Sequence, residues 1–170
     1  ALQSTLSIED HSSCDYKKID KFNLIVQKGV HIIKKNTVFE DNYWKISGSH
    51  DGYLKKFKTI YEREIEFYPE QMKFVGFDKL LRKNNSKDVK FNIRFHLNPS
   101  AKVMKTQNNK SILIELEDEG WKFNCDNYNI NIDNGLYLGI KNSYKENQNI
   151  CISGISKEDN QTIKWEINKI

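Results

Sequence analysis

Apolar and polar residues alternate strictly along residues 89–97, VKFNIRFHL, where the apolar positions are Phe91, Ile93, Phe95 and Leu97. A period of two predicts a β-strand with one buried face and one solvated face. Asn98-Pro99 ends the strand, because proline cannot donate a hydrogen bond to a sheet. The polar face carries Arg94 and His96, which could bind an anion or move a proton, or could simply form the solvated side of a sheet.

Short stretches of the same kind recur along the chain, separated by turns rich in Gly, Asn and Asp. No stretch predicts a helix longer than about two turns, and no linker or fixed repeat divides the chain. We therefore predict one all-β domain over residues 1–170, an antiparallel β-sandwich of the jelly-roll or supersandwich type. The expected strands are 2–8, 23–26, 29–39, 42–49, 59–68, 71–81, 89–97, 102–106, 111–117, 121–125, 130–132, 136–140, 149–155 and 162–167.

The bulk composition describes a globular chain and excludes several function classes. The net charge of +4 comes almost entirely from dispersed lysines, without the concentrated basic patch or motif that nucleic acid selects. No apolar run approaches the roughly 20 residues of a membrane helix. The histidines and the three cysteines lack metal-ligand spacing, so we assign no zinc site, no other metal and no cofactor.

Two local patterns carry candidate chemistry. His50-Asp51-Gly52-Tyr53 brings an imidazole, a carboxylate and a phenol into one loop, the groups that proton transfer requires. The same residues would also make an ordinary turn, with Asp51-Gly52 supplying positive φ angles. Arg63 alternates with apolar residues on its strand, so it could form an ion pair between strands or bind a substrate carboxylate.

In order, these pieces resemble the C-terminal β-sheet domain of heparinase II/III-like polysaccharide lyases. The resemblance covers nearly the whole chain, and its most specific parts are His50–Tyr53 and Arg94–Pro99, RFHLNP. The supporting segments are Ser4–Leu6, Arg63-Glu64, Gly76–Leu80, Gly120–Phe123 and Trp165.

The resemblance implies that this chain is the C-terminal part of a longer protein, following an α/α-toroid domain. The parent protein would cleave uronic-acid-containing polysaccharides by elimination, with most catalytic residues on the toroid, so that this chain alone would be inactive. His50, Tyr53, Arg63, Arg94 and His96 would then be candidates for contact with an anionic polysaccharide. Gln3 stands where the family often has a histidine associated with a structural metal, so the metal is not carried over. The family also suggests a periplasmic or extracellular location.

A second hypothesis is a non-catalytic carbohydrate-binding or assembly β-sandwich. Such a protein would expose a line of aromatic side chains that stack on sugar rings, drawn from Trp44, Trp121, Trp165 and the tyrosines. Most of these aromatic residues alternate with polar ones, as core residues do, so this hypothesis ranks second.

Overall fold

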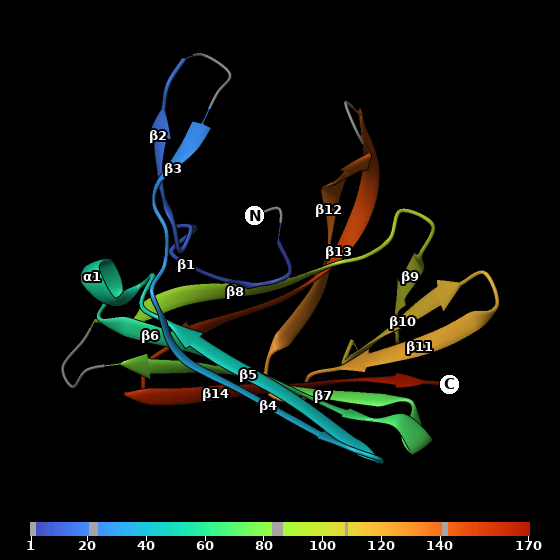
Figure 1. Ribbon diagram of the computed structural model, residues 1–170. Coiled ribbons are helices and arrows are strands. Elements are labelled where there is room, and N and C mark those ends of the chain that lie inside the picture. The colour runs from blue at the N-terminus through green and yellow to red at the C-terminus, as the bar shows by residue number, and fades with distance from the viewer. Residues whose placement is uncertain (1–2, 21–23, 83–86, 108, 141–142) are drawn as a thin grey trace.

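Two antiparallel sheets face each other in the computed structural model, which describes residues 3–20, 24–82, 87–107, 109–140 and 143–170 (Figure 1). The small sheet has the order β1 (Leu6–Ile8), β8 (Val89–His96), β13 (Ser143–Ser156), β12 (Asn129–Ile140). The large sheet has the order β4 (Ile32–Glu40), β5 (Tyr43–His50), β6 (Thr59–Tyr68), β7 (Lys73–Arg82), β14 (Asn160–Lys169), β11 (Glu119–Asn124), β10 (Ser111–Leu116), β9 (Lys102–Lys105).

The remaining elements are small. The strands β2 (Asp15–Lys18) and β3 (Leu24–Lys28) form a separate hairpin, and the helical pieces are α1 (Leu54–Phe57) and a 3-10 turn, Pro69–Gln71. The hairpin and the far ends of β12 and β13 project from the same side of the sandwich as two arms (Figure 1). Within the described residues, the predicted all-β sandwich without a long helix is confirmed.

The burial of side chains along β8 follows the alternation that the sequence predicts. Val89, Phe91, Ile93 and Phe95 are buried and face the large sheet, while the intervening Asn92, Arg94 and His96 lie half-buried on the opposite face. The core between the sheets is completed from the large sheet by Leu80, Ile112, Phe123, Ile163 and Trp165. Burial of these large side chains is the main favourable term holding the two layers together.

Both sheets are assembled from segments far apart in the sequence. In the small sheet, Leu6 of β1 lies opposite Ile93 of β8. In the large sheet, β14 lies between β7 and β11, with Trp165 opposite Gly76. The side chain of Trp165 occupies the space in which a side chain at residue 76 would begin, and that close approach requires glycine.

The ion-pair interpretation of Arg63 is confirmed at the centre of the sandwich. Arg63 and Asp78 lie opposite each other on β6 and β7. The Arg63 Nε and Nη2 atoms donate to the two Asp78 carboxylate oxygens at 2.7 and 3.1 Å. Asp78, which is fully buried, also accepts hydrogen bonds from the Tyr61 hydroxyl and, at 2.8 Å, from the indole of Trp165. These partners satisfy a charge that burial alone would make costly.

The sequence predicts the arms only in part, through residues 23–26 and 136–140. Strand β2 was not predicted, because all of its residues are exposed and none shows a buried alternation. Strand β12 joins the two expected stretches 130–132 and 136–140 into one strand. Strand β13 begins at Ser143, six residues before the expected 149–155, in a polar segment that pairs with β12. At the other end of the chain, the expected strand over residues 2–8 is shortened to β1. Residues 2 and 23, which belong to expected strands, lie outside the described residues.

Candidate functional site

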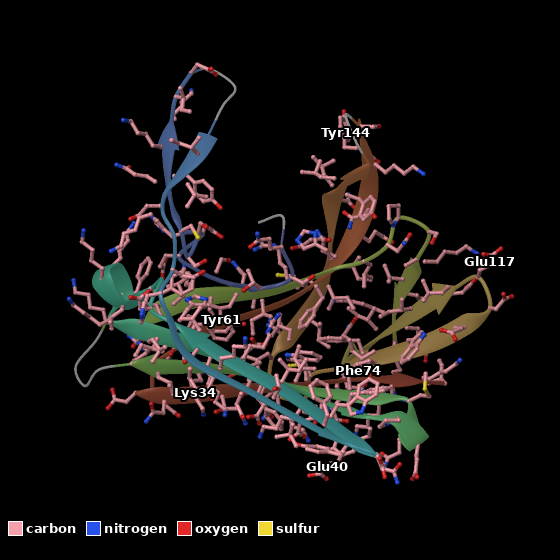
Figure 2. The ribbon with its side chains drawn as sticks, viewed as in Figure 1. Lys34, Glu40, Tyr61, Phe74, Glu117 and Tyr144 are labelled. Atoms are coloured by element: carbon pink, nitrogen blue, oxygen red, sulfur yellow. The ribbon has the colours of Figure 1, made fainter. Side chains whose placement is uncertain are left out.

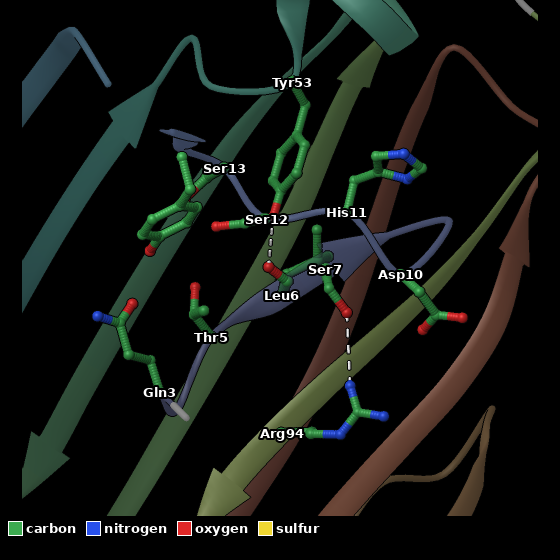
Figure 3. Close-up of a pocket in the computed structure, with 11 residues that line it drawn as sticks. Gln3, Thr5, Leu6, Ser7, Asp10, His11, Ser12, Ser13, Tyr53 and Arg94 are labelled. Atoms are coloured by element: carbon green, nitrogen blue, oxygen red, sulfur yellow. Dashed lines mark hydrogen bonds between the residues drawn. The ribbon is translucent and has the colours of Figure 1, made fainter. Parts of the chain in front are cut away.

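A cavity of about 510 Å³ lies beside β1 (Figure 3), and its lining includes Tyr16 of the β2–β3 hairpin. We call it the N-terminal cavity. Most of its wall comes from the chain between Gln3 and Tyr16, and Tyr53 and Arg94 complete it. The wall is largely apolar, and it carries the carboxylate of Asp10 together with hydroxyl and amide groups; the latter belong to Gln3, Thr5, Ser7, Ser12 and Ser13. Such groups suit the hydroxyls of a sugar.

Arg94 is the cation of the N-terminal cavity. It points from β8 toward Ser7, whose hydroxyl lies 3.5 Å from Nη1 (Figure 3). Its closest carboxylate is Asp133, with Oδ2 at 4.0 Å from Nε, and its side chain is 22% exposed. The guanidinium is therefore only loosely paired, and it keeps donors for an anionic group entering the cavity.

Tyr53 forms the floor of the cavity and is 1% exposed. Its hydroxyl donates a hydrogen bond to the backbone oxygen of Leu6 at 2.7 Å, which attaches the start of α1 to β1 (Figure 3). Burial raises the pKa of Tyr53 to about 12. The phenol therefore stays protonated at neutral pH, and its hydrogen bond to Leu6 is a structural contact.

His50 lies behind Tyr53, with the two ring centres 5.9 Å apart. It ends strand β5, and its Nδ1 accepts a hydrogen bond from the backbone N–H of Gly52 at 3.2 Å. Burial lowers the pKa of the imidazole below its ordinary 6.5. Gly52 does not have the positive φ that the turn interpretation expected; a side chain there would instead collide with Ser13. The glycine allows the loop carrying Ser13 to lie against residue 52.

The structure separates the five candidate residues of the sequence. Tyr53 and Arg94 share the N-terminal cavity, and His50 supports Tyr53 from behind. His96 lies elsewhere, in a cavity of about 290 Å³ between Ser4 and residues 136–139 of β12. Arg63 is held between the sheets by Asp78, although its Nη1 reaches out to donate to the backbone oxygen of Ser4 at 2.6 Å.

The segment Glu9–Ser13 belongs to the candidate site, although the sequence did not identify it. Glu9 and Asp10 adopt positive φ angles of 48° and 57°, which fold this segment back over β1. The fold brings His11 into the wall of the N-terminal cavity and of a neighbouring cavity of about 490 Å³. The only signal in the sequence was a short polar run containing a histidine, which is equally typical of a surface turn.

Among the described residues, no group of three or more His, Cys, Asp or Glu side chains is placed to hold a metal ion. In the same part of the chain, no helix has both the length and the apolar character needed to cross a membrane.

Comparison with known proteins identifies a family to which the chain is similar. The protein family described as "Heparinase II/III-like, C-terminal" matches residues 1–166 of the chain. The chain belongs to this family. No curated protein matches the sequence.

Solved structures of the heparinase family share the fold. The heparan sulfate lyase HepC from Pedobacter heparinus superimposes with a TM-score of 0.75 over 99% of this chain, at 11% sequence identity. A crystal structure of heparinase III gives a TM-score of 0.66 over 98% of this chain, at 13% identity. The present chain spans about a quarter of each, 24% of the HepC chain and 23% of the heparinase III chain.

Proposed function

We propose that this heparinase II/III-like domain is the C-terminal β-sandwich of a polysaccharide lyase, which cleaves uronic-acid-containing polysaccharide by elimination. In that chemistry a base removes the proton beside a carboxylate, and a cation or amide neutralises the carboxylate. We assign the base and most of the catalytic residues to a helical toroid domain of the same protein. The β-sandwich alone is then inactive and contributes substrate contacts.

The observation that carries this proposal is the loosely paired Arg94 in a cavity whose wall includes several hydroxyl groups. A guanidinium can hold a uronate carboxylate through two parallel hydrogen bonds, and hydroxyl and amide groups can bind the sugar hydroxyls. His96 and His50 remain candidates for substrate contact through neighbouring surfaces. Tyr53 and Arg63 contribute indirectly, because their polar groups are bonded to Leu6 and Asp78.

The exposed side chains of the two arms are an argument for a second domain that lies over the N-terminal cavity. Each arm exposes large apolar side chains: Tyr16, Ile25 and Val26 on the β2–β3 hairpin, and Leu136, Leu138 and Tyr144 on the β12–β13 arm. Exposed apolar side chains gathered on projecting strands are typical of surfaces that pack against another domain. We propose that the toroid domain contacts both arms, so that the cavity opens into the cleft between the domains.

The alternative, a non-catalytic carbohydrate-binding sandwich, has one supporting observation. Phe39 and Trp44 are exposed at the edge of the large sheet and continue a row formed by Phe67 and Phe74. Phe67 and Phe74 are stacked on each other with ring centres 4.3 Å apart, so one face of each ring is already covered and is closed to a sugar. Trp165 is buried in the core. This row is therefore the weaker basis for sugar binding.

Lyase activity of the full-length protein, followed as the ultraviolet absorbance of the unsaturated uronate product, tests the proposal. We expect Arg94→Ala to lower kcat/KM by about tenfold or more, and Arg94→Lys to recover part of the loss. His50→Ala tests the region behind Tyr53, and His96→Ala tests the cavity near Ser4. Lys157→Ala is the matched control, since this lysine is exposed and has no ion pair within the described residues.

Two results would contradict the proposal. Absence of unsaturated product from every uronic-acid-containing polysaccharide tried would contradict the lyase assignment. Wild-type kinetics in Arg94→Ala, with the same unfolding temperature as the wild-type protein, would remove this cavity from the substrate path.

A further inference from the structure

Strand β4 is a long edge of the large sheet that no strand in the described part of the chain covers. It runs for nine residues, from Ile32 to Glu40, and pairs with β5 along one side. Every one of its residues is exposed except Val38, which is half-buried. In Figure 1 the strand lies along the outside of the sandwich for its full length. Such an edge presents a row of backbone N–H and C=O groups to any partner strand.

The opposite edge of the same sheet is protected in an ordinary way. Strand β9 has only four residues, Lys102–Lys105, and Lys102 is engaged in an ion pair with Glu115 of the neighbouring strand. Short edge strands and edge lysines prevent sheets from joining. Strand β4 carries Lys34 and Lys35, but at nine residues it lacks the protection of shortness.

Apolar side chains accompany the open edge. Ile32, Ile33 and Phe39 are exposed on β4, and Trp44 and Ile46 are exposed beside them on β5. Phe39 is 66% exposed, although its ring lies 6.3 Å from that of Trp44. A group of exposed apolar residues at an unpaired strand is unfavourable in water and favours association.

The sequence of β4 is complementary to itself when two copies run antiparallel about Thr37. Lys34 then lies opposite Glu40, and Lys35 lies opposite Phe39, where its aliphatic stem can cover the ring. Thr37 faces Thr37 of the other copy, a pair that can share a hydrogen bond across strands. Lys34 and Glu40 lie apart along β4 (Figure 2), and by the strand alternation they share one face of the sheet. The Lys34–Glu40 pair therefore forms twice across the two-fold axis.

The registers about Lys35 and Asn36 lack this complementarity, and the register about Val38 sets Lys35 opposite Asp41, which lies beyond the end of β4. Pairing about Lys35 sets that lysine against its own copy, which places like charges in direct opposition. Pairing about Asn36 sets Glu40 against Ile32 and Lys34 against Val38. The charge pattern therefore selects the register centred on Thr37, in which the lysines that would repel another strand meet an acidic or aromatic partner.

We propose that β4 is a dimerisation edge, which pairs antiparallel with β4 of a second copy of this chain about a two-fold axis at Thr37. The two large sheets then join into one continuous sheet, with the exposed Phe39 and Trp44 side chains of both copies on the same face. This contact lies on the large sheet, whereas the N-terminal cavity and the arms belong to the other side of the sandwich.

Sedimentation velocity of the full chain, applied to the wild-type protein and to charge-reversal variants, tests the proposed dimer. We expect the wild-type protein to dimerise at concentrations of about 10–100 μM, with an association constant that falls as salt is raised. Lys34→Glu and Glu40→Lys should each weaken association by about tenfold, because each change opposes like charges twice. Lys34 also lies 3.8 Å from Glu62 of its own copy, so the unfolding temperature of Lys34→Glu is measured alongside to separate a loss of stability from a loss of association. The double variant Lys34→Glu/Glu40→Lys restores the opposite charges and should recover the dimer. Lys102→Glu, on the other edge, is the matched control and should leave association unchanged.

Disulfide trapping gives an independent readout of the register. Directly opposed residues of antiparallel strands lie about 4.5–5.5 Å apart, within the reach of a disulfide. Thr37→Cys should therefore give a covalent dimer under mild oxidation, whereas Asn36→Cys, which faces Val38, should not. A monomeric wild-type protein throughout this concentration range would overturn the proposal, as would dimers that both single charge variants leave intact. A dimer that is trapped through residue 36 and not through residue 37 would overturn the register.

Discussion

The guanidinium of Arg63 and the carboxylate of Asp78 meet through two hydrogen bonds in the layer where the two sheets face each other. They are directly opposed in the register of β6 and β7, and Asp78 is fully buried. Phe95 of the small sheet lies under the guanidinium, with its ring centre 5.5 Å from the Arg63 Cζ. The pair thus lies where the two layers touch, and its loss affects both.

Replacement of the buried carboxylate should destabilise the fold strongly. Asp78→Asn keeps the size of the side chain but leaves the Arg63 charge without its counterion. We expect a loss of about 3–5 kcal/mol in the free energy of unfolding, measured by chemical denaturation. Glu115→Gln breaks the exposed pair with Lys102 and should cost less than about 0.5 kcal/mol. Similar losses in the two variants would contradict the central role of Asp78.

A methyl group at Gly76 should be as harmful as the loss of a core side chain. The added Cβ of Gly76→Ala would overlap the indole ring of Trp165. We expect a loss of about 2–3 kcal/mol in the free energy of unfolding, because the packed core cannot move the indole aside. Gly29→Ala is the control, since nothing lies within 4 Å of the added methyl group there. Equal stability of the two variants would disprove this close packing.

His50 should make the protein less stable as the solution becomes mildly acidic. Burial lowers the pKa of folded His50 below the 6.5 of the unfolded chain, so the unfolded state binds more protons in this range. The stability contribution is complete above 6.5 and decreases as the pH falls toward the folded pKa. His50→Asn retains an acceptor for the Gly52 N–H and removes the titration. Unfolding temperatures between about pH 8 and about pH 5.5 should fall less in the variant than in the wild-type protein.

The hydroxyl of Tyr53 should be dispensable for activity and useful for stability. Tyr53→Phe removes the hydrogen bond to Leu6 and leaves its backbone oxygen without that donor, at a cost of about 1 kcal/mol. In the full-length protein, kcat/KM should stay within about twofold of wild type, because the phenol is held protonated and engaged. A large loss of kcat with an unchanged unfolding temperature would instead assign the phenol a chemical role.

The sequence was sufficient to predict the sandwich wherever apolar alternation is long. Residues 59–68 and 89–97 were both predicted as strands, although Glu and Arg in the first also favour helix. The parts of the arms that the sequence did not predict are strands such as Asp15–Lys18, which bury nothing and therefore carry no periodic signal. Pairing between distant strands, such as Leu6 with Ile93, leaves no mark in the local pattern either.

The candidate site was predicted only in part, for a related reason. His50 and Tyr53 are close in sequence, yet the structure uses them mainly to support one another and the start of β1. Arg94 was identified from its strand, while the loop that completes its cavity, with His11, lies more than eighty residues earlier in the chain. Cavity walls built by such distant segments depend on tertiary structure, which periodicity does not encode.

The order of strands in the two sheets has a consequence for synthesis on the ribosome. Each sheet has a gap that only a late segment fills: β13 enters between β8 and β12, and β14 enters between β7 and β11. Until residue 169 has left the exit tunnel, the edges of β7 and β11 remain open, and the core lacks Ile163 and Trp165. We therefore expect the two sheets to be completed late, after β13 and β14 have been synthesised, and the open edges to be prone to aggregation until then.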